Sequence, residues 1–296
     1  MGLPERINRF DKFCANFSCS RPSPLIAVHK IDQGAYDKLE RALIAYVSRC
    51  VWACSNPPLD EPSLMKELGL KREQIENCTP NGILKPYRHL NPEFNTLYKA
   101  YADIIRSLNI KDHIGAFFGL LDVRYKEGTV YSKNIGRDYS TEEIHSDAWS
   151  FGISDCIRVL IPMLGDADGN KVEFYAPPEN FDESWLDPLA SYENGAEIAR
   201  RYSKVDISVP KGSMCFFDFA VLHQTVRSQG AGGRVSLGHT IYARIPKNEK
   251  NDPVYPYLTF NDLMGIGKNK FLDFSSFDEG QSASPKPKHW ELTSIP

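Results

Sequence analysis

The sequence has no long apolar run, no strong excess of charge of either sign and no internal repeat. Its 296 residues are 42% hydrophobic and 25% charged, which is enough to bury one sizeable core. No stretch reaches the roughly 18 consecutive apolar residues that a membrane-spanning helix needs. The formal net charge of −3 differs from the basic balance typical of nucleic-acid-binding domains. These absences argue against a transmembrane segment and against a nucleic-acid partner.

Cysteine is present without any paired pattern. The seven cysteines are scattered, and none forms a Cys-x-x-Cys motif. Cys50 and Cys54 lie about one helical turn apart, a spacing that indicates packing more often than a metal pair. The first residues, Met1 to Arg6, lack the basic-then-apolar order of a signal peptide. We therefore expect seven thiols in a reducing compartment and a cytoplasmic protein.

Length and composition predict one elaborated domain over residues 1–296. Residues 1–113 are expected to form a mainly helical region that covers a β core. Within it, apolar side chains at three-to-four spacing predict a helix over 35–54. A second helix is expected to begin at Asn91 as its cap, with Pro92 in the first turn.

The pattern changes to short strands from residue 114 onward, and these predict a jelly-roll core over 114–245. Residues 176–204 read as an insertion, which is either a lid over the site or a surface excursion. Residues 246–296 are expected to form a C-terminal extension with a loose tail from about 275. The expected strands cover residues 114–124, 155–163, 172–175, 205–209, 213–219 and 234–245. Many short strands separated by glycine and proline turns favour a sandwich or jelly roll.

Two short segments carry chemistry. The first contains His145 and Asp147 as His-x-Asp, and the second ends an aromatic strand at His223. Two imidazoles and one carboxylate on one face of a metal ion form a facial triad, which leaves the remaining positions open. A lone His-x-Asp is a weak pattern, because a chain of this length offers one by chance. The second segment strengthens the prediction of a metal site.

Arg234 and Ser236 begin the strand that follows the glycine-rich turn 229–233. Because strand residues alternate between faces, both side chains point the same way, beside the strand that ends in His223. A guanidinium group grips a carboxylate through two charge-assisted hydrogen bonds, and a hydroxyl adds a third. The pair therefore predicts an anion-binding position near the metal. His239 has the opposite parity and should face away.

With these residues the chain resembles the iron(II)/2-oxoglutarate-dependent dioxygenases over residues 114–245. Within that family it is most similar to the phytanoyl-hydroxylase-like branch and to Kdo 3-hydroxylases of lipopolysaccharide. The resemblance implies a mainly β fold with flanking helices, namely a double-stranded β-helix (jelly roll, cupin-like). It also implies that His145, Asp147 and His223 bind Fe(II) and carry catalysis with O2. Arg234 and Ser236 would bind 2-oxoglutarate, and the activity would be hydroxylation of an unactivated C–H bond.

Residues near these motifs suggest the substrate. Each of the basic ones also fits a solvated surface charge, but together they predict a small anionic molecule, such as an acid sugar (Kdo, free or carried on a lipid) or a carboxylic acid. Trp149 fits either a pocket wall or a core aromatic. The candidate substrate residues are Arg124, Lys133, Arg137, Trp149 and Arg158.

Two alternatives stay open. A natural-product tailoring oxygenase that forms double bonds or rings would use the same five metal and co-substrate residues. A cupin-like protein that holds a metal without O2 chemistry would not need the Arg234/Ser236 pair, so that pair argues against it.

Overall fold

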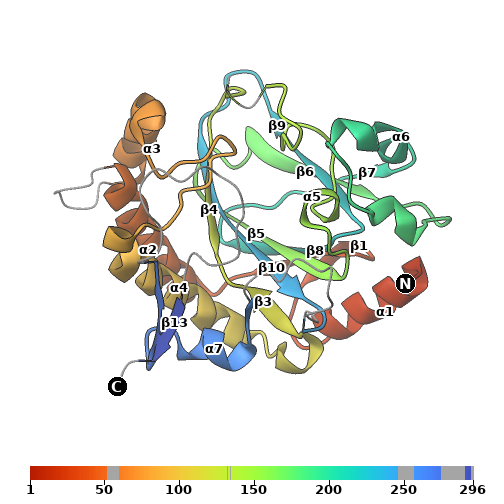
Figure 1. Cartoon of the computed structure of the whole chain (residues 1–296), viewed down its shortest axis with the longest axis horizontal. Coiled ribbons are helices and arrows are strands. Elements are labelled where there is room, and N and C mark those ends of the chain that lie inside the picture. The colour runs from red at the N-terminus through yellow and green to blue at the C-terminus, as the bar shows by residue number, and fades with distance from the viewer. Residues whose placement is uncertain (52–59, 132, 134, 246–256, 275–290, 295–296) are drawn as a thin grey trace.

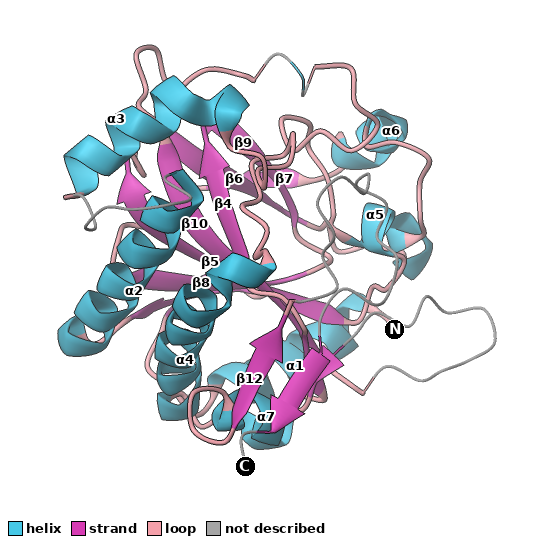
Figure 2. Ribbon diagram, turned by 60° about the vertical axis from the view of Figure 1, so that its left-hand side comes forward, coloured by secondary structure: helices cyan, strands magenta, loops and turns pink. Residues whose placement is uncertain are grey.

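The computed structural model describes residues 1–51, 60–131, 133, 135–245, 257–274 and 291–294. Two antiparallel sheets face each other, and long helices cover the outer side of the larger one (Figure 1, Figure 2). The helices are α1 (Leu3–Cys14), α2 (Gln33–Val51), α3 (Glu61–Lys71), α4 (Asn91–Ser107), α5 (Ala148–Phe151), α6 (Ala196–Ala199) and α7 (Phe260–Gly265). The strands are β1 (Ser20–Ser23), β2 (Ile26–Lys30), β3 (Ala116–Phe118), β4 (Asp122–Lys126), β5 (Cys156–Gly165), β6 (Asn170–Ala176), β7 (Ser203–Val205), β8 (Ser213–Asp218), β9 (Leu222–Arg227), β10 (Arg234–Tyr242), β11 (Tyr257–Leu258), β12 (Lys270–Asp273) and β13 (Glu291–Ser294).

Strand β10 lies in the middle of the larger sheet, whose order is β1-β2-β8-β5-β10-β3-β11. It pairs with β5 along one edge, and its first half pairs with β4 along the other. In this register Arg234 lies opposite Lys126, and Ser236 lies opposite Arg124. Every residue of β10 is buried, because the strand is covered on both faces. The pairing of β4 with β10 therefore places Arg124 and Lys126 next to the Arg-x-Ser motif of β10.

The smaller sheet, β7-β6-β9, packs across the inner face of the larger one. Phe174 on β6 meets Phe217 on β8 with ring centroids 5.1 Å apart. Phe217 also lies 5.0 Å from the ring of His223 on β9. Two antiparallel sheets facing each other in this way, flanked by helices, confirm the predicted mainly β, jelly-roll fold.

Helices α2 and α4 cover the outer face of the larger sheet (Figure 2). The Tyr36 hydroxyl of α2 donates a hydrogen bond to the Met163 carbonyl of β5, at 3.1 Å. His239 of β10 lies between Tyr98 and Tyr101 of α4, with ring contacts of 5.8 and 5.2 Å. The parity argument for His239 is thus confirmed, since its side chain is part of the core on the helical side. No helix among the described residues is long and apolar enough to cross a membrane.

Helix α1 is held against the sheets by a buried arginine. The Arg6 side chain has no exposed surface and donates to Asp218 Oδ1 at 2.6 Å and to Glu183 Oε1 at 2.6 Å. Asp218 ends β8 and is itself fully buried. Because unpaired charges are costly inside a protein, this ion pair fixes α1 to the β8–β9 turn that leads to His223.

Several elements differ from the sequence expectations. Strands β1 and β2 lie within the region expected to be helical and extend the larger sheet. The expected cap Asn91 is the first residue of α4, after Leu90. Its side chain instead accepts a hydrogen bond from the Phe274 amide and donates one to Asp273. The strand expected at 213–219 is β8, but His223, expected at the exit of that strand, lies in a further strand, β9, of the other sheet. Of the expected tail, residues 275–290 and 295–296 lie outside the described residues, and β13 pairs with β12.

Candidate metal centre and adjoining cavity

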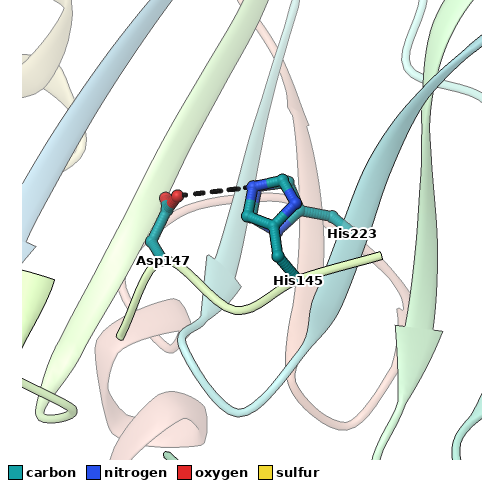
Figure 3. A group of neighbouring side chains, drawn as sticks. All are labelled: His145, Asp147 and His223. Carbon is teal, nitrogen blue, oxygen red and sulfur yellow. Dashed lines mark ion pairs between the residues drawn. The ribbon is translucent and has the colours of Figure 1, made fainter. Parts of the chain in front are cut away.

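Two backbone hydrogen bonds bring His145 and His223 together. The His145 amide donates to the His223 carbonyl at 3.0 Å, and the His223 amide donates to the His145 carbonyl at 2.9 Å. This isolated antiparallel bridge joins a loop to β9 and leaves the two imidazole centroids 4.2 Å apart. Asp147 follows in the same loop, immediately before α5 (Figure 3). The loop and this long-range bridge therefore bring the three residues of the predicted triad together.

The three side chains converge on one point. Asp147 Oδ1 lies 3.7 Å from His145 Nε2 and 3.8 Å from His223 Nε2. One ligand atom of each residue lies within 4.8 Å of the others, so the group can hold a metal ion. His145 Nδ1 lies 2.8 Å from the Glu143 carbonyl oxygen. Because a carbonyl only accepts, Nδ1 carries the proton, and the lone pair of Nε2 is free for a metal.

His145 Nε2 supports this interpretation, because it is buried and has no hydrogen-bond partner among the described residues. Buried polar atoms usually have partners, so an orphaned imidazole nitrogen that faces a carboxylate and a second imidazole fits an absent cation. The donor set, two imidazoles and one carboxylate, is that of a facial triad.

The protonation states also fit a metal site. Burial lowers the pKa of His145 to about 3, with a further contribution from His223. Burial likewise lowers the pKa of His223 to about 4. For Asp147 burial acts to raise the pKa, but His223, Arg158 and His145 outweigh it and lower the pKa to about 2. At neutral pH the cluster therefore holds two neutral imidazoles and a carboxylate, the forms that bind metals.

Arg234 and Ser236 line the same cavity as the triad. Both side chains are almost fully buried, with relative exposures of 2% and 3%. Arg234 Nη1 donates to the Asn170 carbonyl at 2.7 Å, but its Nε has no partner among the described residues. Burial lowers the pKa of Arg234 to about 10, with Arg227 and Arg124 acting in the same direction. A buried guanidinium with a free donor favours an anionic ligand in this cavity.

The predicted substrate residues separate into two groups. Arg124 and Arg158 line the cavity. Lys133 is 62% exposed and forms an ion pair with Glu73 at the surface. Arg137 is not among the cavity-lining residues.

Trp149, the fifth predicted substrate residue, is also outside the cavity lining. It is fully buried, and its Nε1 donates to the Trp185 carbonyl at 2.7 Å. Its side chain thus belongs to the core, where it anchors the insertion at residues 176–204.

Sequence reasoning missed other residues of the cavity, among them Asp122, Thr141 and Thr225. Asp122 and Arg124 share one face of β4 by the same parity that pairs Arg234 with Ser236, so alternation within β4 was an available signal. Thr141 receives a hydrogen bond from Lys126, whose pKa burial lowers to about 7. No comparable signal marks the two threonines, because a threonine in a loop or strand is ordinary.

The insertion places one aromatic ring against a residue of the metal cluster. Tyr192 precedes the short 3₁₀ helix Glu193–Gly195, and its ring stacks on His145. Its hydroxyl lies 2.9 Å from Ser150 Oγ, and the Tyr139 hydroxyl donates to the Leu189 carbonyl at 2.8 Å. The segment is therefore attached to the loop and helix that carry Asp147.

No known protein family and no curated protein matches the sequence. Among solved structures, the chain is similar to SnoN, a non-heme alpha-ketoglutarate-dependent epimerase from nogalamycin biosynthesis, at 13% identity and a TM-score of 0.43, over 99% of this chain and 95% of that one. It is similar to EctD from S. alaskensis in its apo form, at 12% identity and a TM-score of 0.41, over 88% and 84%. It is also similar to SnoK, a non-heme alpha-ketoglutarate-dependent carbocyclase from nogalamycin biosynthesis, at 8% identity and a TM-score of 0.39. That alignment covers 98% of this chain and 96% of SnoK. These similarities are distant, and the assignment of a function therefore depends on the side chains of the cavity.

Proposed function

We propose that this protein is a non-haem Fe(II)/2-oxoglutarate-dependent dioxygenase that hydroxylates an unactivated C–H bond of a small anionic molecule. The observation that carries the proposal is the shared cavity of the triad and Arg234. His145 Nε2 and Arg234 Nε belong to residues that line this cavity, and both atoms are buried without a hydrogen-bond partner among the described residues. A metal ion and a carboxylate would satisfy both.

In this proposal His145, Asp147 and His223 hold the iron. Arg234 and Ser236 hold the far carboxylate of 2-oxoglutarate from one face of β10. Iron and 2-oxoglutarate, once bound, would supply O2 activation coupled to release of succinate and CO2. The chain's own part is placement and exclusion of water. Phe217 and Val172 line the cavity with apolar surface beside the triad, which strengthens the electrostatic contacts inside it.

The charge balance of the cavity supports an anionic substrate. Three guanidinium groups line it, from Arg124, Arg158 and Arg234, against the carboxylates of Asp122 and Asp147. The charges of Fe(II) and of 2-oxoglutarate cancel each other. One excess positive charge then remains in the cavity. We assign it to Arg124, because the contact between Arg124 and Asp122 is long, at 3.9 Å. An acid sugar such as Kdo of lipopolysaccharide fits this charge, in line with the resemblance to the phytanoyl-hydroxylase-like branch and to Kdo 3-hydroxylases, and the carboxylate of an amino acid fits it as well.

A tailoring oxygenase that forms a double bond or ring would use the same residues, and the product distinguishes it from a hydroxylase. A cupin without O2 chemistry accounts for the triad but leaves Arg234 Nε buried without a partner in the part of the chain that the structure describes.

The test is succinate release from 2-oxoglutarate with Fe(II) and O2, over a panel of acid sugars, amino acids and fatty acids. Mass spectrometry of the products follows. A gain of one oxygen supports hydroxylation, and a loss of two hydrogens supports desaturation or ring closure. Failure of the wild-type protein to bind 2-oxoglutarate in calorimetry, with metal present, would overturn the proposal.

A further inference from the structure

We propose that Arg158 is a positioning residue that holds the outer oxygen of Asp147, so that this carboxylate binds the metal through a single oxygen. The inference rests on the proposed metal site. It concerns how many positions on the metal stay open, a property that the three ligand residues alone do not determine.

The two carboxylate oxygens of Asp147 have different surroundings. Oδ1 faces the two imidazoles, at 3.7 and 3.8 Å from their Nε2 atoms. Oδ2 forms an ion pair with Arg158, at 3.4 Å from its Nε. One oxygen is thus directed at the metal position and the other at a guanidinium group.

Arg158 itself is held on its other side. Its Nη1 donates to Thr240 Oγ1 at 2.8 Å, and its Nη2 donates to Asp122 Oδ2 at 2.5 Å. The three nitrogens of the guanidinium group therefore contact three different elements: β10, β4 and the loop that carries Asp147. The side chain is 14% exposed, so little solvent screens these contacts. A rigid planar fork with fixed anchors defines where Asp147 Oδ2 lies.

Gly238 provides the space for this fork. A Cβ atom at position 238 would lie 2.7 Å from Arg158 Nη2 and 3.3 Å from Cζ. Gly238 lies on the face of β10 that also carries Ser236 and Thr240, and it lines the cavity. The guanidinium group therefore crosses β10 where a side chain is absent.

A carboxylate binds metals through one oxygen or through both. With both, Asp147 would occupy a position that a facial triad leaves open for a two-point ligand and O2. A guanidinium group beside Oδ2 opposes that second bond, because its positive charge attracts this oxygen and repels a cation that would approach it. Groups that contact metal ligands commonly fix their orientation in this way.

The experiment compares wild type with Arg158→Met, which keeps a long apolar chain and removes the fork. Arg158→Lys keeps the charge with less geometric definition. Arg244→Met is the matched control, because Arg244 is 83% exposed and forms an ion pair with Asp155 near the same sheet. Mn(II) replaces iron, since it also binds oxygen and imidazole ligands. Water-proton relaxation of the Mn(II) protein reports exchangeable water positions on the metal, and calorimetry then measures 2-oxoglutarate affinity.

We expect Arg158→Met to retain Mn(II), because all three ligands remain. Relaxation per bound Mn(II) should fall by about one third, as one of the open positions closes. The affinity for 2-oxoglutarate should fall roughly tenfold or more. Arg158→Lys should lie between this variant and wild type, and Arg244→Met should match wild type. A purely structural Arg158 would lower the melting temperature without changing the relaxation per bound metal.

Wild-type relaxation and wild-type 2-oxoglutarate affinity in folded Arg158→Met would overturn the inference. If that variant does not fold, Arg158→Gln decides in the same way, because its amide can bond to Thr240 while Asp147 Oδ2 loses its cation. The relaxation measurement needs no co-substrate. If wild type binds Mn(II) but not 2-oxoglutarate, the proposed function fails, and the role of Arg158 is still decided.

Discussion

Tyr192 stacks on His145, with 4.1 Å between the ring centroids and 16° between the planes. Tyr192 is contributed by the insertion at 176–204, so this segment forms a wall of the triad and is not a detached surface excursion. The Glu143 carbonyl accepts from Nδ1 of the same imidazole, and the His223 ring lies 4.2 Å from it. His145 is therefore fixed by three contacts before any metal binds.

Tyr192→Ala should weaken Co(II) binding by about tenfold, since it removes the ring that orients His145. Tyr192→Phe keeps the ring and loses only the contact between the hydroxyl and Ser150. It should therefore bind Co(II) as wild type does. Titration calorimetry of the three proteins checks this, and equal affinities in Tyr192→Ala and wild type would show that the stacking has no effect on the site.

His145→Ala and Asp147→Ala should each abolish stoichiometric Co(II) binding and all 2-oxoglutarate turnover, because each removes one of three ligands. His89→Ala is the control, as His89 is an exposed histidine outside the cavity. Unchanged Co(II) affinity in both triad variants would contradict the assignment of these residues.

Arg234→Ala should weaken 2-oxoglutarate binding by roughly 2–5 kcal/mol, the typical cost of truncating one partner of a buried charge pair. Metal binding should persist, because Arg234 contacts Asn170 and not the triad. Exposed Arg244→Ala serves as the control. Calorimetry of the Co(II) proteins separates the two effects, and loss of metal together with co-substrate would point instead to general unfolding.

His239 makes stability depend on pH. Burial lowers its pKa to about 4 in the folded chain, where it is surrounded by Tyr98, Tyr101 and the Phe118 carbonyl, with Asp122 and Arg158 acting from a distance. The unfolded chain binds the proton more tightly, at the ordinary value of 6.5. The contribution of neutral His239 to the free energy of unfolding is therefore fully present above a pH of about 6.5. It decreases as the pH falls toward 4, by up to roughly 3 kcal/mol.

Urea unfolding of the metal-free protein between pH 7 and 4 tests this effect. His239→Gln should be less stable at pH 7 and should lose less stability across that window than wild type. His145 and His223 titrate in both proteins, so the difference isolates His239. His89→Gln should follow the wild-type profile. Parallel profiles for wild type and His239→Gln would show that another group governs acid unfolding.

Arg6→Ala should lower the free energy of unfolding by about 3 kcal/mol, the lower end of the range for breaking a buried pair, because Asp218 stays buried and keeps only Arg9 as a cationic partner. Arg21→Ala removes a partly exposed pair with Asp11 and should cost about 1 kcal/mol or less. Denaturant titration at neutral pH measures both. Equal losses in the two variants would mean that burial of the Arg6 pair adds nothing.

The sequence predicted His145 with Asp147, and Arg234 with Ser236, because each of these pairs depends on short-range rules. His145 and Asp147 lie in one loop, and strand alternation sets Arg234 beside Ser236. It could not place Lys133 and Arg124 in different environments, since both are cations near the same motif. Only the register between β4 and β10 turns Arg124 into the cavity, and register between distant strands depends on the whole sheet.

Dependence on distant contacts also explains why the sequence did not predict β9 as a separate strand. The apolar run through residue 222 contains no strong break, although the chain turns at Asp218 and enters the other sheet. The cause is a carboxylate that accepts from the Ala220 amide and from Arg6, a residue from the first helix. A turn stabilised by a distant arginine gives no local signal of glycine or proline.

The backbone bridge between His145 and His223 has a consequence for how the chain responds to metal. The two histidines belong to segments far apart in the sequence, and the bridge joins them only when both sheets have formed. An unfolded chain therefore offers no preassembled chelate, and a divalent ion would bind the native state almost exclusively. Such an ion acts as a removable cross-link. At a free concentration about one hundred times its dissociation constant, the ion would add about 2.7 kcal/mol to the free energy of unfolding. A chelator would remove that increment.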